Sequence, residues 1–159
     1  MRKMLLVAVG AVLVVADFVS VSAQASDPRV GTWKLNVAKS QYSPGPPPQS
    51  STLKIEPSGQ GEKVTTEGVN AQGERVATQY TANFDGKDYP LTGSALGADK
   101  VSLKRMSART TERTDKKDGK VMVHIPRVVS PDGKMMTATV KGTNAEGQPV
   151  NNVVVFEKQ

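Results

Sequence analysis

The chain has 159 residues, no cysteine, one histidine and a formal net charge of +6. The missing cysteines exclude disulfides, thiolate metal ligands and a Cys–His catalytic pair. A single histidine excludes a metal site built on several histidines.

The first 25 residues have the pattern of a secretory signal peptide. Arg2 and Lys3 form a basic start, residues 4–16 are apolar, and Ala23 and Ala25 satisfy the small-x-small rule for cleavage. This apolar run is shorter than the roughly 20 residues that span a bilayer. We therefore expect cleavage after Ala25, export to the periplasm or beyond, and no membrane span in the mature chain 26–159. Export without disulfides is typical of a bacterial envelope protein.

After the leader, the pattern is that of strands and turns. Residues 30–35 form an opening strand around the only tryptophan, Trp33, and the prolines between 44 and 48 then exclude helix. Farther on, apolar residues alternate with polar ones, and Asp-Gly pairs at 85, 118 and 132 are typical of tight hairpins. The alternating segments are 53–55, 76–84, 121–125, 136–140 and 154–156.

The fold class follows from this period of two. No segment after residue 25 shows a sustained helical period, so the pattern predicts one all-β domain, residues 26–159, built as an antiparallel up-and-down meander. We count eight to nine strands. A linear meander of that size closes into a barrel to remove its edges, so we expect a monomeric, lipocalin-like β-barrel.

The basic segment 100–127 breaks the alternation. Continuing the phase of Val101 and Leu103 would bring three arginines to the same face: Arg105, Arg109 and Arg113. A bulge at 104–105 would reset the phase, turning Met106, Ala108 and Thr110 inward and the arginines outward. We favour the bulge, because an unpaired buried guanidinium is costly. The alternative is that some arginines point inward and hold an anionic ligand group.

With the arginines outward, the segment forms a basic face. Its residues are Arg105, Arg109, Arg113, Lys116, Lys117 and Lys120. No aromatic side chain lies between residues 100 and 127, which argues against nucleic acid as the partner. Anionic envelope polymers or lipid headgroups, attracted by charge alone, are the partners that this face predicts.

The sequence offers no catalytic motif. His124 lies between Val123 and Ile125, so its side chain points to the opposite face, toward solvent or the rim. No Gly-rich loop joins a strand to a helix, and no carboxylate pair is set apart by its spacing. We expect a protein that is not an enzyme and that uses neither cofactor nor metal.

Both ends of the mature chain resemble the calycins, the group that includes lipocalins and fatty-acid-binding proteins. "VGTWKL", residues 30–35, is similar to their first strand, and "VVFEK", residues 154–158, is similar to the last strand of the fatty-acid-binding family. The resemblance implies that these two strands pair and that Trp33 plugs the barrel's base. Residues 129–159 also resemble a group of small exported bacterial proteins without known activity, some of them called lipocalin-like.

The chain departs from these families at several places. Where the fatty-acid-binding family has a helical lid, residues 36–51 are proline-rich, and the Arg-x-Tyr pair that clamps a ligand carboxylate is replaced by Val154 and Phe156. The lipocalins' final helix is missing. Their arginine over the tryptophan has one candidate here, Arg127, or none.

Two functions remain open. The first is a binding protein for a small apolar or amphipathic ligand, held by Tyr80, Phe84, Met136 and Phe156. Trp33 is then the base plug, or, as the alternative, stacks on the ligand. The second is an envelope structural or interaction protein with a filled barrel, acting through the basic face.

Overall fold

The structure is a computed structural model that describes residues 26–159; the expected signal peptide lies outside them. In this range no helix is long and apolar enough to cross a bilayer. The elements are ten strands and one short 3-10 helix: β1 (Gly31–Leu35), η1 (Val37–Lys39), β2 (Ser50–Ser58), β3 (Gly61–Val69), β4 (Arg75–Asn83), β5 (Tyr89–Thr92), β6 (Lys100–Arg105), β7 (Thr110–Lys117), β8 (Lys120–Val129), β9 (Met135–Thr143) and β10 (Pro149–Lys158).

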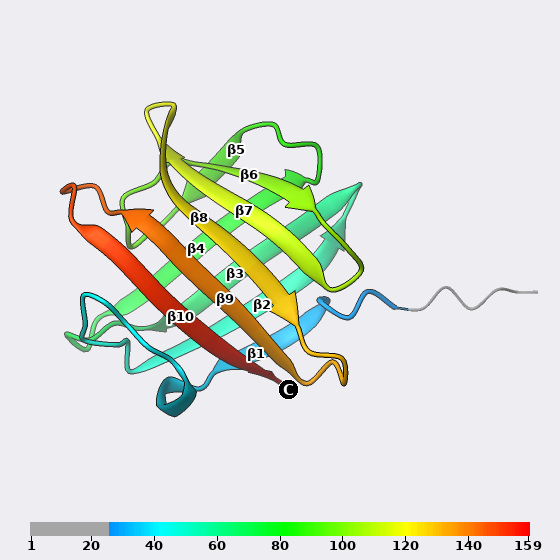
Figure 1. Ribbon diagram of the computed structural model, residues 1–159, viewed down its shortest axis with the longest axis horizontal. Coiled ribbons are helices and arrows are strands. Elements are labelled where there is room, and N and C mark those ends of the chain that lie inside the picture. Colours follow the sequence, from blue (N-terminus) through cyan, green and yellow to red (C-terminus); the bar gives the residue numbers. More distant parts are fainter. Residues whose placement is uncertain (1–25) are drawn as a thin grey trace, which may run out of the picture.

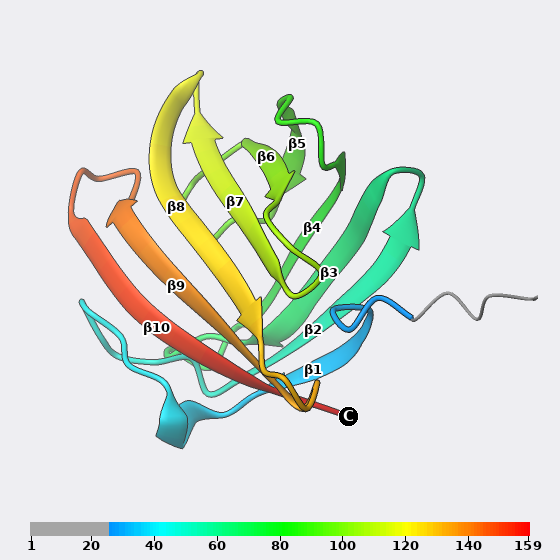
Figure 2. The same cartoon turned by 45° about the vertical axis from the view of Figure 1, so that its right-hand side comes forward.

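The strands form one closed antiparallel barrel in which each pairs with its neighbours in sequence (Figure 1; Figure 2). Closure comes from β1, which pairs with β2 on one side and with β10 on the other: Trp33 lies opposite both Leu53 and Lys158. The expected meander closed into a barrel is therefore confirmed.

The strand count of eight to nine was wrong, because residues 26–159 contain ten strands. β5 has four residues, including Pro90, and pairs over two residues with each neighbour. Such a short strand has no measurable alternation, and a proline within it lowers its strand propensity. The barrel wall is least regular at this position.

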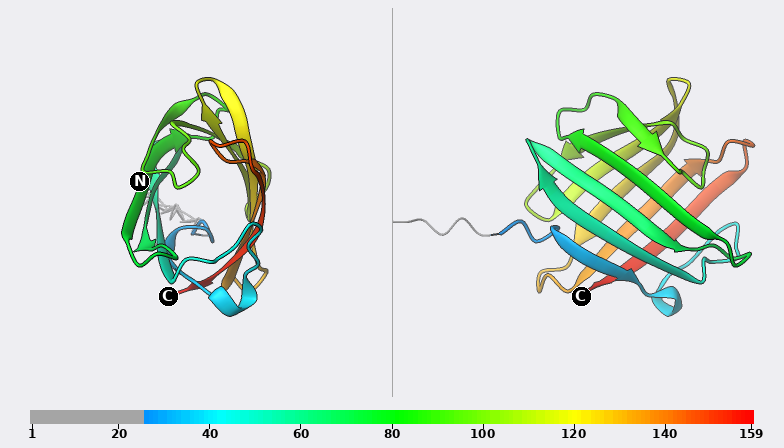
Figure 3. Two further views of the ribbon diagram at one scale, coloured as in Figure 1. Left: turned by 90° about the vertical axis from the view of Figure 1, so that its left-hand side faces the viewer. Right: turned by 180° about the vertical axis from the view of Figure 1, so that it is seen from behind.

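Two irregular segments mark the ends of the barrel. Residues 26–30, which we call the clasp, cross one end, where the turns 106–109 and 130–134 also lie. Residues 36–49, which we call the strap, lie at the opposite end with the turns 118–119 and 144–148 (Figure 1; Figure 3). The strap follows β10 after β1 has ended: Gln41 and Val153 exchange backbone hydrogen bonds, and the Asn151 amide donates to the Ser43 carbonyl.

Trp33 belongs to the core at the clasp end. Its side chain is 0% exposed, and its indole N–H donates to the Arg29 carbonyl oxygen at 2.9 Å. The ammonium of Lys158 lies 5.0 Å from the ring centre and donates to the Pro28 carbonyl at 2.9 Å. The tryptophan thus fixes the clasp to β1, and Lys158 fixes it to β10.

The expected bulge at residues 104–105 is not there. β6 and β7 pair without interruption from Lys100 opposite Lys116 to Arg105 opposite Thr111; the register shifts instead between β7 and β8, at Asp115 and Lys116. Met106 is 62% exposed in the turn that follows, so Met106 and Ala108 do not point inward. Arg113 therefore keeps the inward phase of Leu103.

We predict that Trp33→Phe destabilises the fold by about 2 kcal/mol or more, since it leaves a cavity and an unpaired buried carbonyl. Urea unfolding followed by circular dichroism measures the change, because the variant has no tryptophan fluorescence. Val128→Ala, on the exposed face of β8, is the control and should change stability by no more than about 0.5 kcal/mol. Equal losses in both variants would contradict a fastening role for Trp33.

Candidate functional site

The barrel interior holds a buried carboxylate, Glu62, at the start of β3. It shares the inward phase of Val64, and its side chain is 2% exposed. Arg29 of the clasp donates to one carboxylate oxygen at 2.8 Å; the other oxygen accepts from Tyr80 of β4 at 2.9 Å and from Arg127 of β8. Arg127 also donates to the Tyr80 hydroxyl at 3.2 Å. Three elements, the clasp, β4 and β8, thus meet on one carboxylate of β3.

From Glu62 the ionic contacts continue into the clasp. Arg29 pairs with Asp27 as well as with Glu62, and Asp27 in turn pairs with Arg105 at 2.6 Å. The guanidinium groups of Arg29 and Arg105 each lie 4.7 Å from the ring centre of Phe84, so the ring is held by two cations. The network closes the clasp end of the barrel.

A second ion pair lies deeper in the barrel, on β7. Arg113 donates through two nitrogens to the two carboxylate oxygens of Asp115, at 2.6 and 2.7 Å. The guanidinium lies 4.8 Å from the centre of the Tyr80 ring, which places it beside the Glu62 cluster. The prediction that Arg113 faces outward was therefore wrong. The cost of burying an unpaired guanidinium does not arise for Arg113, because Asp115 pairs with the guanidinium through two hydrogen bonds, the geometry that best offsets burial.

Charge and burial act against each other on these groups. Burial alone would raise the pKa of Glu62, but attraction to Arg127, hydrogen bonds and attraction to Arg29 outweigh it, and the pKa is lowered. Burial raises the pKa of Tyr80 to about 12, so its hydroxyl stays protonated and available as a donor at neutral pH. The cluster is therefore ionised and internally paired under ordinary conditions.

One part of the inner wall is packed less completely than the rest. Side chains such as Val101, Leu103 and Val123 are 0% exposed. By contrast, a set of inward apolar side chains on β1, β2, β8, β9 and β10 keeps 6–9% exposure: Leu35, Leu53, Ile125, Ala138, Val140 and Phe156. The half-buried Val154 pairs with Ala138, and Phe156 pairs with Leu35, so the set is contiguous.

We call this set, with Val154, the apolar wall. Arg113 also keeps 15% side-chain exposure although its partners Asp115 and Tyr80 are buried. Surface that remains accessible on inward side chains borders space that a solvent molecule can reach. The interior therefore combines a charged region near the clasp, whose groups are paired with one another, with an apolar region whose buried side chains keep 6–9% exposure.

The four expected ligand-lining residues do not share one environment. Tyr80 is held by Glu62 and Arg127, Phe84 lies between two guanidinium groups, and Met136 is buried at 1% exposure. Phe156 alone of the four belongs to the apolar wall. Sequence periodicity found the inward face correctly but could not tell which inward residues are already packed against neighbours.

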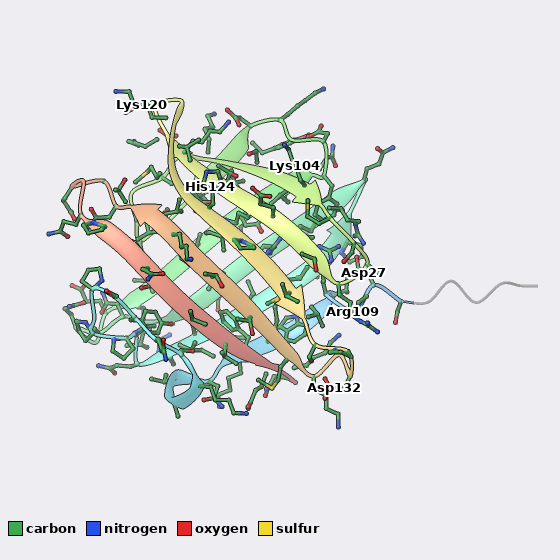
Figure 4. All side chains as sticks on the ribbon, viewed as in Figure 1. Asp27, Lys104, Arg109, Lys120, His124 and Asp132 are labelled. Atoms are coloured by element: carbon green, nitrogen blue, oxygen red, sulfur yellow. The ribbon has the colours of Figure 1, made fainter. Side chains whose placement is uncertain are left out.

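The expected basic face is divided among several places. Arg113 is inside the barrel, Lys116 is paired with Asp88, and Lys117 with Asp99. Arg105 and Arg109 lie at the clasp end, whereas Lys117 and Lys120 lie at the tip of the β7–β8 hairpin, at the strap end (Figure 4). Because β7 spans the height of the barrel, the six residues do not form one surface.

Two further expectations concern single residues. His124 is exposed on the outer face of β8, with its Nδ1 3.3 Å from the Thr114 hydroxyl. Arg127 does not cover Trp33; the cation over the indole ring is Lys158. Arg127 is instead paired with Glu62.

Sequence reasoning missed Arg29, Glu62 and Asp115 as buried residues, and Asp27 as the half-buried partner of Arg29. The available signal was phase: Glu62 is two residues from Val64, and Arg127 lies between Ile125 and Val129 in the same alternation. Charged residues in an inward phase predict buried partners of opposite charge. Which partners these are depends on strand pairing and barrel closure, and a single sequence does not reveal them.

The ionisable side chains of this interior are paired with one another. Its carboxylates are engaged by cations, and the described residues hold no group of three or more His, Asp or Glu side chains placed to bind a metal. Ion pairs and apolar side chains can hold and orient a molecule.

No protein-family model and no curated protein sequence matches this chain. Among solved structures, a fatty acid binding protein of Schistosoma mansoni, in complex with arachidonic acid, is similar over 83% of this chain and 96% of its own, with a TM-score of 0.50. The sequence identity is 15%, so the similarity shows a shared fold. This fold agrees with the calycin-like barrel expected from the sequence.

We predict that Asp115→Ala costs about 3–5 kcal/mol of unfolding free energy, because it leaves the Arg113 guanidinium unpaired in the interior. Replacing both residues, as Arg113→Met with Asp115→Leu, should recover most of this loss. A double-mutant cycle by urea titration measures the coupling. The exposed pair Lys54–Glu56 is the matched control and should show about 0–1 kcal/mol. Similar coupling in both pairs would contradict burial of the Arg113–Asp115 pair.

The free energy of unfolding should also depend on pH through the ionisation of Glu62. Since its pKa is lower in the folded chain than its ordinary 4.5, the stability that it contributes is present above pH 4.5 and is lost as pH falls through the folded pKa. We expect Glu62→Gln to be less stable than wild type at pH 7 and to lose less stability between pH 5 and about 3. Urea titrations across this range test the slope, with the exposed Glu67→Gln as control.

Proposed function

We propose that this protein is an exported, non-catalytic binding protein that holds a small apolar molecule inside its barrel. The observation that carries the proposal is the apolar wall, where contiguous inward side chains keep accessible surface while most of the remaining core is closed. Burying such surface against a ligand is favourable, at about 25 cal/mol per Å². The leader-like first 25 residues support export.

The fold supports the same proposal. The similar structure from Schistosoma mansoni is a fatty acid binding protein, so a barrel of this kind can enclose an apolar molecule. Access would be from the strap end, since the ionic network and Trp33 close the clasp end. The strap contains no helix over its proline-rich part, residues 41–49, so it leaves this mouth without a helical cover.

The alternative, an envelope interaction protein with a filled barrel, needs a surface for its partner. Its expected basic residues lie at both ends of the barrel and in its interior, which weakens an attraction that depends on clustered charge. We therefore prefer the binding protein and treat the alternative as an outcome of its test.

Native mass spectrometry of protein purified from its own host should show a bound molecule of low mass. The refolded, empty protein should also increase the fluorescence of N-phenyl-1-naphthylamine, an uncharged apolar probe, in a saturable manner. Empty protein from the host, no response to the probe, and binding to anionic vesicles at low salt would together overturn the proposal in favour of the alternative.

A substitution on β9 tests whether the ligand binds beside the apolar wall. Ala138→Phe fills the space beside the apolar wall and should weaken probe binding at least about tenfold, equivalent to about 1.4 kcal/mol. Thr139→Phe, one residue away on the outer face of the same strand, is the control and should bind the probe like wild type. Circular dichroism verifies that both variants are folded. Equal affinities would place the probe outside the barrel.

A further inference from the structure

The donors around Glu62 form a complete anion-binding arrangement. Two guanidinium groups and one phenol hydroxyl converge on a single carboxylate that is 2% exposed. Their positions are fixed from three separate elements: Arg29 by the clasp, Tyr80 by β4 and Arg127 by β8. Charge-assisted hydrogen bonds of this kind are strong and prefer a planar, two-oxygen anion. The arrangement would hold a free carboxylate equally well.

Two nitrogen donors of this arrangement make no hydrogen bond with the described part of the chain. The Nε atoms of Arg29 and Arg127 are buried and have no hydrogen-bond partner within residues 26–159. The anion that fills the arrangement belongs to the chain itself, since Glu62 is a residue of β3. The remaining interior guanidinium, that of Arg113, is matched through both oxygens of Asp115.

The interior therefore satisfies its own cations. A carboxylate ligand that approached Arg127 or Arg29 would meet the negative charge of Glu62, and at Arg113 it would meet Asp115. In a region of low dielectric such like-charge contacts are strongly unfavourable. An uncharged ligand lying against the apolar wall meets no such opposition.

We propose that Glu62 is the specificity-determining residue of the barrel: an internal counter-anion that occupies the anion site and restricts the ligand to uncharged molecules. The part of this proposal that concerns the ligand rests on the proposed function, whereas the part that concerns the anion site does not. The carboxylate replaces, inside the protein, the head group that the site would otherwise bind. Removing it should expose a site for small carboxylates.

The anion site is tested without any apolar ligand. Glu62→Ala is heated in sodium formate or in sodium chloride at the same ionic strength, and the midpoint of unfolding is followed by circular dichroism. Formate should raise the midpoint of the variant in a saturable manner, as expected for a ligand that binds only the folded state. Wild type and Glu67→Ala, which loses an exposed carboxylate from the outer face of the same strand, should respond alike to both salts.

Formate that stabilises Glu62→Ala no more than chloride does would overturn the proposal. If the variant does not fold in chloride, its refolding yield in formate is the readout, and recovery in formate alone supports the site. If Glu62→Ala refolds in neither salt, Glu62→Gln replaces it in this test. The proposal is then overturned if Glu62→Gln has the same ligand preference as wild type.

The ligand's charge is tested with a pair of equal chain length, 1-dodecanol and dodecanoate, each displacing N-phenyl-1-naphthylamine at pH 7.5. Wild type should prefer the alcohol, and Glu62→Gln should shift the ratio of the two affinities toward the carboxylate by at least about tenfold. An unchanged ratio would overturn the role of Glu62 in specificity. If wild type binds neither molecule nor the probe, the proposed function fails, whereas formate rescue of Glu62→Ala still establishes the anion site.

Discussion

The carboxylate of Glu62 is the interaction on which the closed end of this barrel depends. It joins the clasp, β4 and β8 through Arg29, Tyr80 and Arg127, so three elements that are distant in sequence share one partner. Among the described residues Arg127 pairs with no other carboxylate, and a buried guanidinium that lacks a counter-charge is costly. The network therefore favours one arrangement of the strands as well as stabilising the fold, because its members come together only when the clasp, β4 and β8 are placed as they are here.

Burial and charge divide the interior into two regions with different capacities. Near the clasp, ion pairs and the Phe84 ring between two cations join the clasp to the barrel wall. Toward β9 and β10, small apolar side chains such as Ala138 and Val140 are buried but keep 6–9% exposure. For the binding function that we propose, the paired base limits the loss of conformational freedom on binding, and the apolar wall supplies the favourable burial.

The fold was largely predictable from the sequence, and the site was not. Period-two alternation and Asp-Gly turns are local signals, and they were sufficient for the meander. The pairing of the strands around Trp33 and Phe156 was expected from the resemblance of the chain's ends to the calycins. The strand count was too low in this part of the chain: β5, with four residues and one proline, carries no period, and the segment through which the phase of Val101 was continued to Arg113 is two strands, β6 and β7. The orientation of Arg113 depends on Asp115 and on a register shift in the neighbouring pair β7–β8, and the interior role of Glu62 depends on partners from three other elements. These are contacts of the closed barrel, which a local pattern does not contain.

The pairing of β1 with β10 has a consequence for how the chain folds. Residues 33 and 158 are partners. One edge of β1, near the start of the chain, can therefore be covered only after almost the whole chain has been synthesised. Closing a loop of this length costs more entropy than forming any single hairpin, and contacts of such long range form slowly. Hairpins along the meander can form early, but the tryptophan reaches its buried position, against Leu53 on one side and beside Lys158 on the other, only when the barrel closes. We therefore expect the fluorescence of Trp33 to report closure of the barrel, and a chain that lacks β10 to leave the second edge of β1 uncovered.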